Sequence, residues 1–250
     1  MQVPTVENVF ARSWDLLTQN WIIIVPGVVV GLIVGILSGT YSLSQPDTYG
    51  SPSGTALSFT YGFGAFLAGI VLAITAIAGY IITQCYTAGM AGAAWQRGVT
   101  TLGDGTRAVN EDAGNVLLAA VYLFLFGILA VILAPFTLFL SIFAFYLFTL
   151  YTIAAAVVGN QRGMNALRES FAIARARFGT TLVIGIVLAV LQLVGRLIAH
   201  LFSFAPLLGP IVAAIIAQIV VAYAVLVVVG EYLVLRPGVT PPGAPPPNTY

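Results

Sequence analysis

The sequence predicts an all-α polytopic membrane protein with six transmembrane helices as three hairpins, each preceded by a short amphipathic surface helix. Composition is the first reason: 60% of the 250 residues are hydrophobic and 7% are charged, whereas soluble domains carry about 25% charged residues. Several apolar runs are also long enough to cross a hydrocarbon core about 30 Å thick. Short charged segments with helical periodicity precede some of these runs.

The longest of these charged segments is 160–178, reading NQRGMNALRESFAIARARF. One set of its residues recurs at spacings of three and four and so shares one face of a helix: Leu167, Ser170, Phe171, Ala174 and Phe178. The segment is too short and too charged to span a bilayer, and its pattern is typical of a helix lying in the membrane surface. The alternative is a solvated loop helix between two spans. We predict that three of its arginines contact lipid headgroups: Arg168, Arg175 and Arg177.

The same pattern recurs near the N-terminus. Residues 8–14 (NVFARSW) align with 165–171 (NALRESF), and in both copies a second aromatic residue, Trp21 or Phe178, opens the next apolar run. A weaker third copy is 101–115 (TLGDGTRAVNEDAGN), in which Gly103 and Gly105 predict a poor helix. The chain therefore reads as three repeats of a surface helix followed by a transmembrane hairpin.

We expect residues 1–236 to form a single membrane domain. A Pro-rich cytoplasmic tail follows at 237–250. The segment 57–95 is too long for one span, so we interpret it as a span whose helix continues beyond the membrane; two short spans are the alternative. The predicted spans are approximately 21–43, 59–82, 115–134, 136–158, 178–199 and 210–235, and Pro135 is expected to mark a tight turn between the third and fourth.

The arginines predict the orientation. With six spans, all but Arg196 of the nine arginines fall on one side of the membrane, and two short spans in 57–95 would divide them. Cytoplasmic loops of membrane proteins carry an excess of Lys and Arg. This rule predicts that both termini lie in the cytoplasm and that the protein lies in the cell (inner) membrane.

Two short segments carry a family resemblance. The segment Ala166-Leu167-Arg168-Glu169-Ser170-Phe171 and the closing Glu231-Tyr232-Leu233-Val234-Leu235-Arg236 resemble the membrane domain of glycerophosphoryl diester phosphodiesterases and the YciC-like integral membrane proteins. The resemblance implies a six-helix membrane domain. In that family the chemistry belongs to a separate soluble barrel, which these residues do not contain.

The sequence offers little that could carry catalysis. Cys85 and His200 are the single cysteine and histidine, and no nucleophile–base pair, cofactor motif or metal-ligand spacing is found. The net charge of +1 gives no general attraction to nucleic acid. Gln192, Arg196 and His200 form a candidate polar site at the outer end of the fifth span; the alternative is that Arg196 simply extends to the interface. Glu231 is expected to form a structural ion pair with Arg236 or to contact a headgroup.

Glycine recurs at every fourth position of the first span, at Gly27, Gly31, Gly35 and Gly39. Such a glycine zipper permits close approach of another helix. The expected partner is either another subunit or the small-residue face of the second span, which comprises Ala65, Gly69, Ala73 and Ala76.

The function predicted from these features is non-enzymatic. We expect a scaffold or accessory subunit that binds the lipid bilayer and packs against other membrane-protein subunits or itself. The alternative is a transporter or channel for a small solute or lipid, because a polar site between repeats would suit that role.

Overall fold

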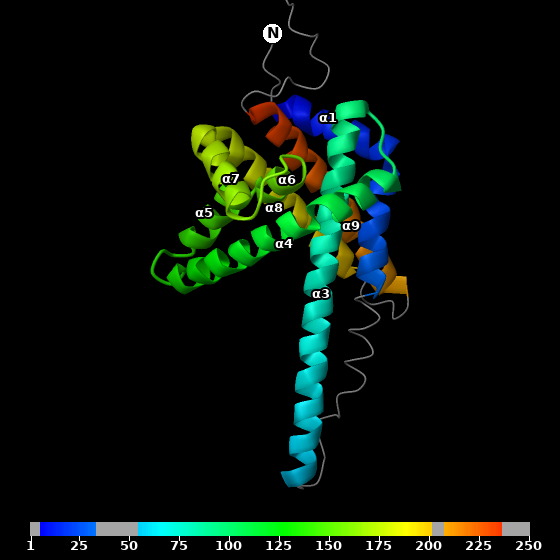
Figure 1. The fold of residues 1–250 in the computed structure, drawn as a ribbon, viewed down its shortest axis with the longest axis vertical. Helices are drawn as coiled ribbons and strands as arrows, with labels where there is room; N and C mark the ends of the chain where they lie inside the picture. Colours follow the sequence, from blue (N-terminus) through cyan, green and yellow to red (C-terminus); the bar gives the residue numbers. More distant parts are fainter. Residues whose placement is uncertain (1–5, 34–54, 202–207, 237–250) are drawn as a thin grey trace, which may run out of the picture.

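The computed structural model describes residues 6–33, 55–201 and 208–236, and most of these residues are helical with no strand among them (Figure 1). The all-α prediction is therefore confirmed for the described chain. A helix without a label continues after η1 as far as Ile33. In chain order the labelled elements are α1 (Val6–Gln19), η1 (Trp21–Ile24), α3 (Thr55–Arg97), α4 (Leu102–Leu133), α5 (Leu140–Thr149), α6 (Thr152–Val157), α7 (Met164–Ala176), α8 (Phe178–Leu201) and α9 (Leu208–Leu235).

Five stretches in the described part are long and apolar enough to span a membrane. A sixth is obtained if α1 and residues 21–33, which meet at 89°, are counted as one bent span. The chain thus has the helices of a membrane protein, while the count of six and the three-hairpin arrangement remain predictions. The five stretches are Phe66–Arg97, Leu102–Leu133, Leu140–Val157, Phe178–Leu201 and Ala214–Leu235.

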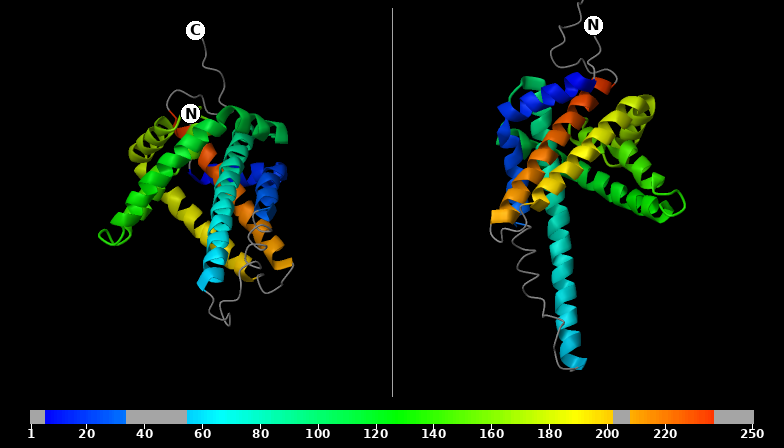
Figure 2. Two further views of the ribbon diagram at one scale, coloured as in Figure 1. Left: turned by 60° about the horizontal axis from the view of Figure 1, so that its bottom comes forward. Right: turned by 180° about the vertical axis from the view of Figure 1, so that it is seen from behind.

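Helix α9 is central, and it contacts α1, α3, α6 and α8 (Figure 2). Trp95, at the end of α3, packs against it because Gly230 has no side chain in the space that the indole ring occupies. The Trp95 Nε1 donates a hydrogen bond to the Leu226 carbonyl at 2.8 Å. The guanidinium of Arg12 on α1 lies 4.8 Å from the Trp95 ring centroid, so this tryptophan joins three helices.

Helix α3 is one continuous helix, so the alternative of two short spans in 57–95 is wrong. Its two halves differ in environment. From Ile81 to Trp95 most side chains are buried or half-buried against α4 and α9, whereas most of those from Phe66 to Tyr80 are exposed. Figure 1 shows the first half of α3 extending away from the other labelled helices.

The predicted third surface helix does not form as a separate element. Helix α4 begins at Leu102 and runs without interruption to Leu133. Asp104 caps its start by accepting a hydrogen bond from the Thr101 amide at 2.8 Å, which satisfies a backbone donor that the helix leaves free. The aromatic ring of Tyr86 fills the space beside Gly105, so this glycine is used for packing and does not interrupt the helix.

The predicted fourth span, 136–158, starts later than expected and contains a break. Residues 134–139 form a turn around Pro135, as predicted, and α5 begins only at Leu140. The helix is then interrupted at 150–151. The Ser170 hydroxyl of α7 bridges this break by accepting a hydrogen bond from the Tyr151 amide (3.1 Å) and donating one to the Phe148 carbonyl (2.8 Å).

Helices α1 and α7, which the repeat prediction aligned, bury equivalent residues. Ser13 and Ser170 are both fully buried, and the aromatic residues that follow them, Trp14 and Phe171, are both exposed. Residues 8–14 and 165–171 have nearly the same pattern of buried and exposed positions. The internal repeat itself stays a prediction.

Helices α1 and α7 and the final turns of α3 and α9 lie at one end of the molecule (Figure 1). If both termini are cytoplasmic, this end should be accessible from the cytoplasm. Single cysteines at Thr101 and Gln161, in a variant in which the buried Cys85 is replaced by Ala, should react only with a thiol reagent supplied from the cytoplasm. A cysteine at Leu138, in the turn before α5, should react from the opposite side. Labelling of position 161 from outside would contradict the orientation.

Candidate functional site

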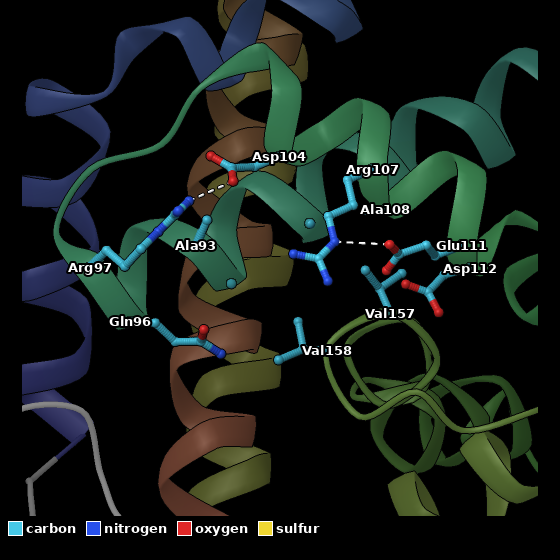
Figure 3. A pocket seen from close by; sticks show the side chains of 12 residues that line it. Ala93, Gln96, Arg97, Asp104, Arg107, Ala108, Glu111, Asp112, Val157 and Val158 are labelled. Carbon is cyan, nitrogen blue, oxygen red and sulfur yellow. Dashed lines mark hydrogen bonds and ion pairs between the residues drawn. The ribbon is translucent and has the colours of Figure 1, made fainter.

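A charged pocket of about 310 Å³ lies where the last turns of α3 meet the first turns of α4 and the end of α6 (Figure 3). Small residues of α3 form one wall. A Cβ atom at Gly89 would collide with Ala108 of α4, and one at Gly92 would lie 3.0 Å from Val158 Cγ2. The absence of these side chains brings the helices together and leaves room for the charged residues of α4.

Two ion pairs border this pocket. Arg97 at the end of α3 pairs with the capping residue Asp104, and Arg107 pairs with Glu111 at 2.9 Å (Figure 3). Both members of the Arg107–Glu111 pair are exposed, and an exposed pair of this kind contributes little to stability because water screens the two charges. The second ion pair can therefore open at little cost to meet another charge.

Asp112 is the buried carboxylate of the pocket, with 8% of its surface exposed. It accepts a hydrogen bond from Asn115 Nδ2 at 3.2 Å, and Asn115 also donates to the Asn160 side chain at 3.3 Å. No described arginine forms an ion pair with Asp112. These contacts connect α4 to the segment that leads into α7.

The pocket can bind a small polar or zwitterionic group, since it presents guanidinium and carboxylate groups within one cavity. It contains neither a histidine nor a thiol. Cys85 is buried nearby and its Sγ donates to the Ala108 carbonyl at 3.2 Å. Within the described part of the chain, no cluster of three His, Cys, Asp or Glu residues is placed to hold a metal ion.

Glu231 is a second buried carboxylate, with 3% of its surface exposed. The expected ion pair with Arg236 does not form, because Arg236 pairs with Glu169 of α7 at 3.3 Å. No hydrogen bond or ion pair joins Glu231 to another described residue, and Arg177 is the one cation near enough to interact with it electrostatically. An isolated buried carboxylate is costly, so Glu231 is a candidate functional residue.

The three predicted lipid-binding arginines, Arg168, Arg175 and Arg177, are exposed on α7 or directly after it. None of them forms an ion pair with a described carboxylate. The fourth charged residue of this segment, Glu169, behaves differently. It accepts a hydrogen bond from the Tyr232 hydroxyl at 2.7 Å in addition to the ion pair with Arg236, and so it joins α7 to the end of α9.

The predicted apolar face of α7 is divided between protein and the exterior. Ser170 and Ala174 are buried against the protein, as are Ala166 and Ile173, which the predicted face did not include. Phe171 and Phe178, which the predicted face did include, are exposed. The helix therefore lies on the protein with one part of its surface and keeps aromatic side chains outward with another.

Of the four glycines predicted to pack against a helix, Gly27 and Gly31 lie in the described part, whereas Gly35 and Gly39 lie outside it. Their neighbour is Gln218 of α9. A Cβ atom at Gly27 would collide with the Gln218 amide, and one at Gly31 would lie 3.8 Å from its Nε2. The described glycines thus face α9, and the contact with the small-residue face of the second span stays a prediction.

The candidate polar site at Gln192, Arg196 and His200 lies along α8. Gln192 is half-buried, and the other two residues are exposed on the same side of the helix because they are four residues apart. The described chain places no hydrogen-bond or ion-pair partner against Gln192 or Arg196. The structure therefore builds no polar cluster around Gln192 or Arg196 from its described residues.

The sequence interpretation missed both the charged pocket and the role of Glu169. One available signal was the spacing Thr101-x-x-Asp104, which is typical of a helix start. Another was Ser170, a polar residue within an apolar helical face. Asp112 carried no such signal, because its burial depends on α6, which is distant in the sequence.

Comparison with known proteins gives no assignment: no family model, no curated protein and no solved structure matches the chain. The resemblance to the membrane domain of glycerophosphoryl diester phosphodiesterases and YciC-like proteins therefore stays a prediction.

The isolation of Glu231 can be tested by replacing it with Gln. The amide keeps the shape of the side chain and removes a buried charge that has no ion-pair partner among the described residues, so the thermal midpoint in detergent should stay the same or rise. Glu7→Gln, at an exposed position of α1, is the control and should change stability by less than about 0.5 kcal/mol. A loss of about 3–5 kcal/mol in the Glu231 variant would show that the carboxylate is paired.

Proposed function

We propose that this chain is a non-enzymatic integral membrane protein that acts as a scaffold or accessory subunit. It would pack against lipid and against other membrane-protein subunits or a second copy of itself. The arrangement of the candidate spans supports this role, because most of their residues are not buried inside the chain. A protein whose apolar helices face outward has surface available for partners as well as lipid.

The observation that carries the proposal is the exposed half of α3. Large apolar side chains are exposed along it, among them Phe66, Val71 and Ile74, each more than 60% exposed. Small residues lie between them at Gly69 and Ala73. Since lipid provides no hydrophobic driving force between helices, partners pack where small residues permit close contact. The exposed half of α3 is the segment of the described chain best suited to such contact.

The proposed location is the cell (inner) membrane with both termini in the cytoplasm. Support comes from arginines on α1 and α7 and at the ends of α3 and α9, namely Arg12, Arg97, Arg168, Arg175 and Arg236. These elements meet at one end of the molecule (Figure 1). A membrane protein that follows the positive-inside rule keeps such an end on the cytoplasmic side.

The proposed family relationship gains support from one contact. The two segments that carry the resemblance, 166–171 and 231–236, meet through Glu169, Tyr232 and Arg236. If the chain shares its membrane domain with that family, the two short motifs would be expected to contact each other in this way. The proposal assigns no hydrolase activity to this domain.

A transporter or channel is the second candidate function, and the charged pocket and Glu231 favour it. A coupled transporter normally has ionisable groups buried near its pathway, and the described chain provides Asp112 and Glu231. Flux of a zwitterionic solute in vesicles that is lost in both Asp112→Asn and Glu231→Gln would favour this function over the scaffold role.

The scaffold proposal can be tested by photo-crosslinking in cell membranes. A photoreactive residue at Ile74 on the exposed half of α3 should give a discrete protein adduct, because a partner helix would lie there. Mass spectrometry would identify the adduct as another membrane protein or a second copy.

The control position is Leu193 on α8, which is 58% exposed compared with 61% at Ile74. Helix α8 already has a partner helix within the chain, α9. The exposed Leu193 is therefore expected to face lipid and to form lipid adducts. If Ile74 also forms lipid adducts alone, α3 has no protein partner and the scaffold proposal fails.

A further inference from the structure

We infer that α7 forms a binding site for a single anionic phospholipid, with the phosphate on Arg168 and Arg175 and one acyl chain in the adjoining apolar hollow. The inference rests on the proposed membrane location but not on the scaffold role. It goes beyond general contact between arginines and headgroups, because it assigns one lipid to one place.

The site consists of two hollows that share a border. The first, of about 520 Å³, is lined by Arg168, Phe171 and Arg175 together with two alanines of α7. The second, of about 360 Å³, lies between α4, α5 and α7. Arg168 and Phe171 line both hollows, so a ligand can extend from one into the other.

The first hollow suits a phosphate. Arg168 and Arg175 are seven residues apart, which places them two turns apart on the same side of α7. Both are exposed, and neither forms an ion pair with a described residue. The one carboxylate of this helix, Glu169, already binds Tyr232 and Arg236. The guanidinium groups therefore remain available to an external anion.

The second hollow suits hydrocarbon. Phenylalanine rings dominate its lining, and those of Phe148 and Phe171 are stacked with their centroids 4.4 Å apart. The only neutral polar side chain in the lining is Thr149, whose hydroxyl donates to the Phe145 carbonyl of its own helix at 2.8 Å. Hydrocarbon placed here meets apolar surface and leaves no polar group without a partner.

The two hollows together select the ligand. A free phosphate would use the arginines and leave the apolar hollow unused, and an uncharged lipid would do the reverse. An anionic phospholipid joins a phosphate to an acyl chain, so it matches the cationic and apolar parts at once. Arg177 lies outside both hollows, and so this site uses two of the three predicted arginines.

The test is a lipid titration of the full chain in detergent, read by native mass spectrometry. Dioleoyl phosphatidylglycerol should bind with one high-affinity adduct, and dioleoyl phosphatidylcholine should bind more weakly. Replacing Arg168 and Arg175 together with Gln should weaken phosphatidylglycerol binding about thirtyfold. Arg162→Gln is the matched control, since Arg162 is exposed and has no ion-pair partner among the described residues, and it should leave binding unchanged.

A second pair of variants tests whether an acyl chain occupies the second hollow. Ala144→Leu extends a side chain into the second hollow and should weaken binding of dioleoyl phosphatidylglycerol while the thermal midpoint is retained. Ala189→Leu makes the same change at an exposed position on α8 and should have no effect. Competition by inorganic phosphate would show a free-anion site instead. Equal adduct formation by wild type, the double Arg variant and the Ala144 variant would show that binding depends on neither the arginines nor the second hollow, and either result overturns the inference.

Discussion

The side chains of Glu169 and Ser170 fix α7 against the protein, and the positions of α5, α6 and α9 depend on them. Ser170 completes the backbone hydrogen bonds at the break between α5 and α6. Glu169 holds the end of α9 through Tyr232 and Arg236. A break that is buried from water needs such partners, because its free amides and carbonyls have no solvent to bond. The amphipathic segment is therefore a structural joint as well as a surface helix.

Different polar contacts hold the end of α1 at the same end of the protein. The Asn20 side chain donates to the Gly98 carbonyl and accepts from the Thr100 amide, so it binds the loop between α3 and α4. Trp95 then connects α3 to α9. Away from these contacts the helices diverge and expose their apolar side chains (Figure 2). A firmly bonded polar end with outward-facing apolar helices is an arrangement suited to contact with lipid and partner helices.

Composition and periodicity predicted the helical class, the start of α8 and the turn at Pro135, since long apolar runs and prolines act locally. The break at 150–151 could not be predicted, because it is stabilised by Ser170 from a helix further along the chain. The expected ion pair between Glu231 and Arg236 was wrong for a similar reason: Arg236 is close to Glu231 in sequence, but Glu169 binds that arginine in space. Asp112 and its pocket depend on contacts between α3, α4 and α6 that local patterns do not contain.

The most direct test of this account is a double-mutant cycle between Glu169→Gln and Tyr232→Phe, measured as the free energy of unfolding in detergent. If Glu169 holds α7 to α9, the two changes should be coupled by about 0.5–3 kcal/mol. The pair Glu111→Gln and Tyr232→Phe is the control, since these side chains share no hydrogen-bond partner, and its effects should add. Additivity within about 0.3–0.5 kcal/mol for the Glu169 pair would contradict the account.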